Sequence, residues 1–113
     1  MTPREARLSF PPEGFQGQCS CFPDRILGPK GWAELNPHCR YHDWQYRILG
    51  EHRGQWSTLE WDRHREWADA ALYAGVVLEL QKAWGRWVGK RIAKVMWQAV
   101  RSKLGEAAAK GTW

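Results

Sequence analysis

One histidine and one distant carboxylate are the side chains of this chain best spaced to act together. His42 lies in a stretch that also contains Cys39 and Tyr46, and residues three and four apart share one face of a helix. Asp69 lies in a later stretch, on a helical face whose other residues are apolar and should be buried. A buried carboxylate needs a partner. If the two helices pack antiparallel, Asp69 can reach His42 and stabilise its protonated form, as the partner of a general base does.

Asp43 adds a metal ligand beside this histidine. Successive helical residues are about 100° apart, so Asp43 points away from the face of His42 and toward the glycine-bearing arm that precedes the helix. Backbone carbonyls at Gly28 and Gly31 can complete an oxygen-rich Ca2+ site, because calcium accepts carbonyl ligands and glycine permits sharp turns. A base, an orienting carboxylate and a hard-metal ligand together indicate metal-assisted hydrolysis of an ester.

The histidine-bearing helix should follow an irregular arm. Residues 1–35 hold five of the six prolines and many of the glycines, which predicts loops and turns without paired strands. Asn36 and Pro37 then form a helix start and Gly50 a stop, which predicts a helix over residues 37–49.

Two further helices are expected after it. Ser57 and Glu60 match a capping box, and apolar residues then recur at helical spacing over residues 58–83. The short connection before this helix favours antiparallel packing on the first, and a third, basic amphipathic helix follows directly. The 113 residues are therefore predicted to form one all-α domain, with a helical core over residues 36–105 and a tail over residues 106–113.

The third helix is expected to be apolar on one side and basic on the other. No Asp or Glu occurs between Lys82 and Lys103. The apolar stripe of this helix should consist of Trp84, Val88, Ile92, Val95, Met96 and Ala99. Nine tryptophans are more than a core of this size can bury, and indole favours wet apolar boundaries. The side chains expected to contact a membrane or a protein partner are Trp84, Trp87, Lys90, Arg91 and Lys94.

The same helix can equally be an ordinary packed helix with a solvated basic face. Nucleic acid is a less favoured partner, because no recognised binding motif is present. No apolar run is long enough to span a bilayer, and the first ten residues lack the apolar segment of a secretory signal. We therefore expect a chain that is made in the cytoplasm and is either associated with a virion or exported by a signal-independent route.

The residues around His42 resemble the active-site helix of phospholipase A2. The matching string is Cys39-Arg40-Tyr41-His42-Asp43-Trp44-Gln45-Tyr46. A second string, Arg65-Glu66-Trp67-Ala68-Asp69, resembles the Asp-bearing helix of short prokaryotic members of that superfamily. The segment Cys21-Phe22-Pro23-Asp24 is similar to the one that those members tie to the active-site helix by a disulfide. The resemblance covers roughly residues 19–73.

This resemblance implies a role for each matched side chain. His42 would be the base, Asp69 its partner and Asp43 the calcium ligand. Tyr46 would support the pair through a hydrogen bond, and Tyr73 would be a second supporting tyrosine on the face of Asp69. The implied reaction is calcium-dependent hydrolysis of a phospholipid acyl ester, in which the metal stabilises the developing oxyanion.

The three cysteines leave several states open. The resemblance implies a disulfide between Cys21 and Cys39, with Cys19 as a free thiol. A rival interpretation places all three cysteines and His42 on a tetrahedral Zn2+, although the spacing from Cys19 to Cys21 is tighter than in the usual zinc sites. Three reduced thiols without a ligand are the third state, and it suits a reducing compartment.

The sequence also departs from the family pattern. Gln45 stands where a cysteine usually follows the His-Asp pair, the glycine-dense calcium loop is reduced to Gly28 and Gly31, and Lys30 brings a positive charge near the metal. The same skeleton resembles small proteins of tailed phages and bacteria. Two functions therefore remain open: a calcium-dependent phospholipase A2-like hydrolase, and a non-catalytic phage or bacterial structural or assembly protein that retains the scaffold and keeps His42 and Asp69 only as a structural pair.

Overall fold

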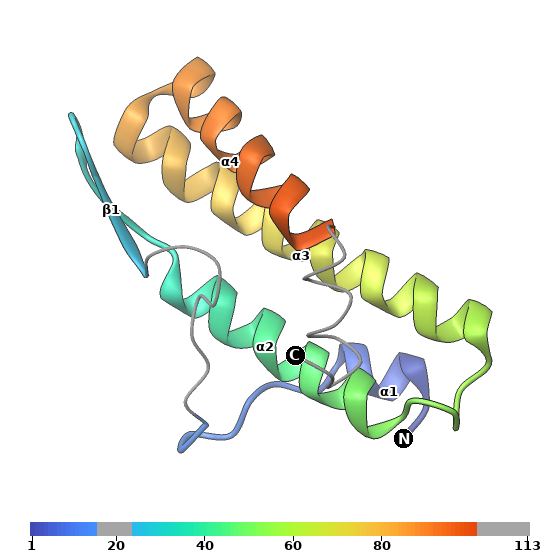
Figure 1. The fold of residues 1–113 in the computed structure, drawn as a ribbon. Coiled ribbons are helices and arrows are strands. Elements are labelled where there is room, and N and C mark those ends of the chain that lie inside the picture. The colour runs from blue at the N-terminus through green and yellow to red at the C-terminus, as the bar shows by residue number, and fades with distance from the viewer. Residues whose placement is uncertain (16–23, 102–113) are drawn as a thin grey trace.

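The computed structural model describes residues 1–15 and 24–101. This part of the chain contains four helices and two strands, in the order α1 (Pro3–Arg7), β1 (Arg25–Gly28), β2 (Gly31–Glu34), α2 (Asn36–Glu51), α3 (Thr58–Trp84) and α4 (Arg86–Arg101) (Figure 1). The long helix α3 is central, because both α2 and α4 pack against it. The fold is mostly helical, as predicted, but it is not strictly all-α.

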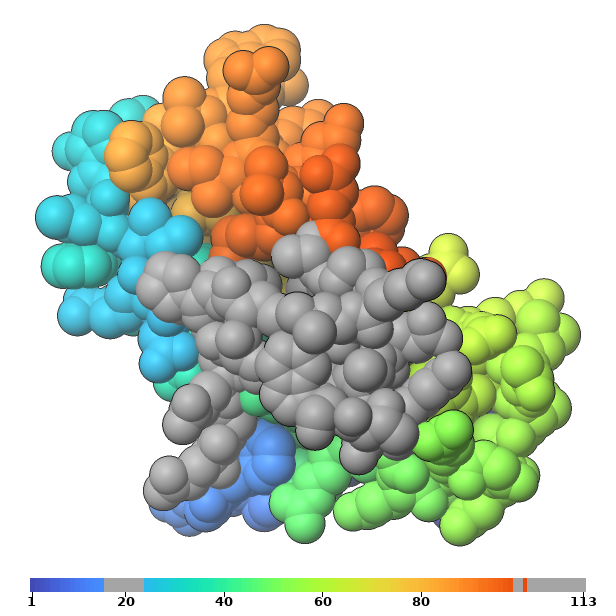
Figure 2. Space-filling view, in the orientation of Figure 1, coloured from blue at the N-terminus to red at the C-terminus, as the bar shows by residue number. Residues whose placement is uncertain are grey.

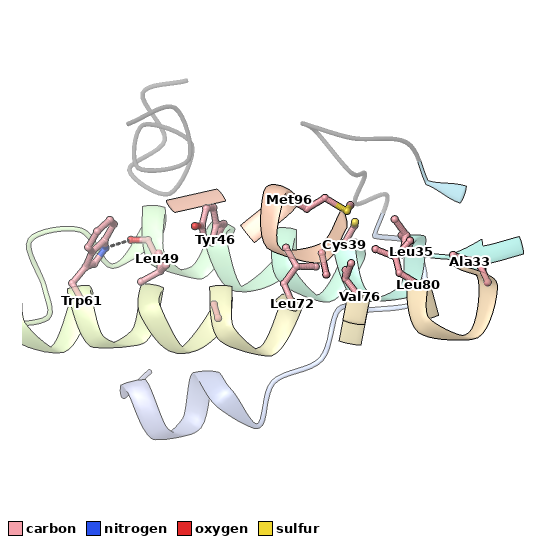
Figure 3. Close-up of a cluster of buried hydrophobic side chains, with 13 residues drawn as sticks. Ala33, Leu35, Cys39, Tyr46, Leu49, Trp61, Leu72, Val76, Leu80 and Met96 are labelled. Carbon is pink, nitrogen blue, oxygen red and sulfur yellow. Dashed lines mark hydrogen bonds between the residues drawn. The ribbon is translucent and has the colours of Figure 1, made fainter. Parts of the chain in front are cut away.

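Helices α2 and α3 run antiparallel, as predicted. The end of α2 meets the start of α3, where the Trp61 indole donates to the Leu49 carbonyl over 2.8 Å (Figure 3). The start of α2 lies beside the end of α3, where Leu35 and Leu80 are both fully buried. This arrangement places the middle of α2 opposite the middle of α3.

Local sequence signals fix the ends of these helices. The Ser57 hydroxyl accepts from the Glu60 N–H over 3.1 Å, and the Glu60 carboxylate accepts from the Ser57 N–H over 3.2 Å, so the predicted capping box of α3 is present. Pro37 lies in the first turn of α2, where a backbone N–H would have no partner within the helix. Gly50 was expected to end α2, but the helix continues to Glu51.

The prediction that residues 1–35 lack paired strands was wrong. Strands β1 and β2 form an antiparallel hairpin in which Leu27 pairs with Trp32 and Gly28 with Gly31. Gly31 has a φ of 125°, which an L side chain rarely adopts, so glycine permits this turn. Each strand has only four residues and lies close to Pro29, so the alternation of apolar and polar residues is too short to indicate a strand in the sequence.

The N-terminal arm also contains a helix that the sequence analysis missed. Helix α1 is a single turn, started by a capping box between Thr2 and Glu5. Helix α2 holds this arm in place, because the Gln45 amide donates to the carbonyls of Ala6, at 2.8 Å, and Ser9, at 3.1 Å. Gln45, which replaces a cysteine of the family pattern, therefore anchors the arm.

Helix α4 buries only part of its predicted apolar stripe. Met96 is buried and Ile92 packs against the core, as predicted, whereas Val88 and Val95 are exposed and Gly89 and Ala93 are buried instead. A Cβ at Gly89 would lie 2.6 Å from backbone atoms of α3, so the absence of a side chain there lets the two helices approach closely. Close backbone packing, rather than the largest apolar side chains, therefore decides which face of α4 is buried.

The buried apolar side chains of α2, α3 and α4 form one cluster, whose larger members are shown in Figure 3. Leu80 lies in this cluster with no exposed surface, and Leu78, on the same helix, is 61% exposed. Leu80→Ala should lower the free energy of unfolding by about 2–5 kcal/mol, because it removes buried methyl groups and leaves a cavity. Leu78→Ala should change it by less than about 0.5 kcal/mol. Urea denaturation of both variants checks this prediction, and equal losses would contradict the core assignment.

Candidate functional site

The predicted contact between His42 and Asp69 is confirmed. His42 lies in the middle of α2 and Asp69 in the middle of α3, and the antiparallel packing brings Nε2 of His42 to 2.7 Å from Oδ1 of Asp69. Asp69 has no exposed surface and His42 is buried as well. A carboxylate in such a place must be fully hydrogen-bonded to remain ionised.

Tyr46 is the second donor to this carboxylate, as predicted. Its hydroxyl hydrogen-bonds the same oxygen, Oδ1 of Asp69, and its ring lies 4.1 Å from the imidazole of His42, measured between centroids. Burial and the charge of Asp69 raise the pKa of the Tyr46 hydroxyl far above its ordinary value, although nearby Arg65 acts in the opposite direction. Tyr46 therefore stays protonated and donates.

Arg101 is the third donor, and the sequence analysis missed it. Its guanidinium Nη1 lies 2.8 Å from Oδ2 of Asp69, so the last residue of α4 reaches the centre of α3. Arg101 is one of the basic residues between Lys82 and Lys103, and nothing in its spacing distinguishes it from those on a solvated face. The available signal was the carboxylate itself, since a fully buried Asp has about four acceptor positions and one histidine cannot fill them.

These contacts determine which ring nitrogen of His42 carries the proton. Arg101 has only donor groups, and the protonated Tyr46 hydroxyl donates to the carboxylate. Asp69 is therefore the acceptor in this cluster, and His42 donates to it from Nε2–H. Nδ1 of His42 then carries the lone pair, and no described residue hydrogen-bonds it. Nδ1 is therefore the atom of this site that can accept a proton from a bound water or alcohol.

The expected calcium ligands do not come together. Asp43 is half-buried, one residue after His42. Gly28 instead packs against the carbonyl of Ala83, to which the neighbouring Lys30 N–H donates over 3.0 Å. Ala83 follows Asp69 by 14 residues of α3, a separation of about 21 Å at the usual helical rise.

The choice of Gly28 and Gly31 as metal ligands was therefore wrong, because these residues form the hairpin turn at the far end of α3. Within residues 1–15 and 24–101, no group of three His, Cys, Asp or Glu side chains could hold a metal ion. Asp43 is the one predicted ligand that lies next to the histidine.

Cys39 is disulfide-bonded and buried, one helical turn before His42. Cys19 and Cys21 lie outside the described residues, so the pairing of Cys21 with Cys39 stays a prediction. A sulfur atom in a disulfide is not a thiolate, and it cannot be the zinc ligand that the rival interpretation required.

Tyr73 was predicted to support the pair of His42 and Asp69, but it makes a different contact. Its ring lies 6.2 Å from that of Trp97, and no hydrogen bond links it to Asp69 among the described residues. Tyr73 lines a small pocket between α3 and α4, and Asp69 is the only charged residue among the described residues that line it. The lining residues are Asp69, Leu72, Tyr73, Val76, Ala93, Met96 and Trp97.

The expected contact surface is present in part. Trp87, Lys90, Arg91 and Lys94 are exposed on α4. Trp84 is half-buried against the apolar cluster, so its assignment to this surface was wrong. In the part of the chain that the structure describes, no helix has both the length and the apolar character that a membrane span requires.

Comparison with known proteins adds no relative. No protein-family model, no curated protein and no solved structure matches the chain. The likeness to phospholipase A2 therefore depends on the motif residues and on the contacts described above.

The role of Arg101 can be tested through stability. Arg101→Met should lower the free energy of unfolding by about 1–2 kcal/mol, because it removes a charge-assisted hydrogen bond from a buried carboxylate at a partly exposed position. Lys94→Met, an exposed basic position of the same helix, should cost less than about 0.5 kcal/mol. Urea denaturation measures both, and the assignment fails if Arg101→Met costs no more than Lys94→Met.

A second buried histidine should make stability depend on pH. Burial, and then the positive charge of Arg7, lower the pKa of His64 from 6.5 to about 4. Between these values the unfolded chain binds more protons than the folded one, so stability is full above about pH 6.5 and falls as the pH drops toward 4. The loss attributable to His64 should approach about 3 kcal/mol. His64→Gln should flatten this dependence in urea denaturation at several pH values, and an unchanged slope would contradict it.

Proposed function

We propose that this chain is a phospholipase A2-like hydrolase of phospholipid acyl esters that requires calcium. One observation carries the proposal: a buried, triply hydrogen-bonded carboxylate holds Nε2–H of His42, and Nδ1 of the same ring has no hydrogen-bond partner among the described residues. A ring nitrogen in that state can take a proton from a bound water molecule.

The reaction uses groups of this chain as follows. Nδ1 of His42 takes a proton from a water molecule while the water oxygen attacks the ester carbonyl carbon. The imidazolium that forms is stabilised by the Asp69 carboxylate, to which Tyr46 and Arg101 also donate. The bond from the carbonyl carbon to the alcohol oxygen then breaks, and the proton on His42 passes to that oxygen. The products are a fatty acid and a lysophospholipid.

The calcium requirement is part of the proposal, and it depends on Asp43. A Ca2+ ion on the Asp43 carboxylate would stabilise the negative charge that develops on the carbonyl oxygen. Further ligands are not assigned, because the two predicted glycines lie at the other end of α3.

Fatty-acid release from phosphatidylglycerol vesicles tests the function. The wild-type chain should release fatty acid with calcium and not with a chelator. His42→Gln should lower the rate by at least about 100-fold, the usual contribution of a general base. The matched control is His38→Gln on the same helix, where the histidine lies 3.8 Å from Glu79 and outside the site; it should keep activity within about twofold of wild type.

The alternative function predicts a different result. A structural or assembly protein of a phage or bacterium that retains this scaffold would show the same background release with calcium, with chelator and in His42→Gln. That result would remove the hydrolase proposal. Fatty-acid release that persists with the chelator but is lost in His42→Gln would support an ester hydrolase that does not require calcium.

A further inference from the structure

The outward face of α4 combines exposed apolar and basic side chains. Trp87 is 78% exposed, Val95 66% and Val88 47%, whereas Gly89 is buried against α3. The basic residues Arg86, Lys90, Arg91 and Lys94 are also exposed. We call these seven side chains the α4 outer face.

A second pair of exposed apolar residues lies at the same end of the molecule. Leu27 and Trp32, which face each other across the hairpin, are 57% and 51% exposed. The hairpin turn is fixed to the last residues of α3 by the hydrogen bond from the Lys30 N–H to the Ala83 carbonyl, immediately before α4 begins. Figure 2 shows the hairpin (cyan) and the first half of α4 (orange) together at this end.

The charged side chains of α4 are all basic. No Asp or Glu occurs between Leu80 and Arg101, and Arg101 itself turns inward to Asp69. Among the described residues, no acidic side chain forms an ion pair with the four basic residues of the α4 outer face. The surface is therefore complementary to a negatively charged partner.

The mixture of side chains favours one such partner. Valine side chains neither stack on bases nor hydrogen-bond phosphates, so Val88 and Val95 would gain little from a nucleic acid. At a bilayer surface they can enter the apolar boundary, tryptophan occupies the headgroup level, and Lys and Arg are attracted to anionic lipids.

We propose that the α4 outer face, together with the hairpin pair Leu27 and Trp32, docks on the surface of an anionic phospholipid bilayer. The contact is shallow, because the other face of α4 is packed on α3 and only side chains of the outer face can enter the lipid. The inference rests on the proposed function for its choice of lipid, and it deepens that function by naming the surface through which the chain would meet a phospholipid membrane. Binding can be measured without hydrolysis.

Co-sedimentation with vesicles tests this surface, with a chelator present so that no calcium-dependent hydrolysis interferes. One set of vesicles contains phosphatidylcholine alone, and the other also contains phosphatidylglycerol. The wild-type chain should bind the second set more tightly, and salt should weaken this binding. The variant Lys90→Glu with Lys94→Glu should bind at least about 30-fold more weakly, since each basic residue near an anionic surface contributes about fivefold.

The matched control reverses two charges elsewhere. Arg53→Glu with Arg63→Glu alters exposed residues near the start of α3 by the same total charge, and binding should stay within about threefold of wild type. Trp87→Ala tests the apolar part: it should remove most of the binding that persists at high salt, whereas Leu59→Ala, an exposed apolar residue at the start of α3, should not. Circular dichroism verifies that all variants remain helical.

Several outcomes would overturn the proposal. They are an absence of binding to anionic vesicles, equal losses in the variant and its matched control, and binding to a DNA duplex or a Trp87-dependent dimer in place of vesicle binding. Vesicle binding by a chain that releases no fatty acid would retain this surface and reject the hydrolase, and hydrolysis of dispersed substrate without vesicle binding would do the reverse.

Discussion

A single buried negative charge places the strongest constraint on this structure. Asp69 has no contact with solvent, and a carboxylate in that position is tolerated only if donors surround it. The donors come from both neighbouring helices: His42 and Tyr46 from α2, and Arg101 from α4. The packing of α2 and α4 on the central helix and the chemistry of the site are therefore parts of one arrangement.

The sequence was sufficient to predict the α2 and α3 part of this arrangement. Helical spacing placed His42 and Tyr46 on one face, a capping box fixed the start of α3, and a short connection implied antiparallel packing. Each of these signals is local or depends on a short connection, so the contact between His42 and Asp69 could be predicted from the sequence.

The remaining features depend on contacts between distant segments, and here the predictions failed. The burial of Gly89 and Ala93 in place of Val88 and Val95 follows from close backbone packing at Gly89, which a pattern of large apolar residues does not reveal. The hairpin has strands of only four residues, and its attachment to Ala83 carries Gly28 away from Asp43. Arg101 looked like one more solvated cation because only tertiary packing shows which residue it meets.

The position of Arg101 at the end of α4 also has a consequence for biosynthesis. A nascent chain that has emerged only as far as α3 already contains the histidine, the tyrosine and the carboxylate, but it lacks the cation that compensates the buried charge. Burial of Asp69 therefore remains unfavourable until α4 has left the ribosome. The contact between His42 and Asp69 should form late in translation. Polypeptides that terminate before Arg101 should be poorly packed around Asp69 and accessible to proteases.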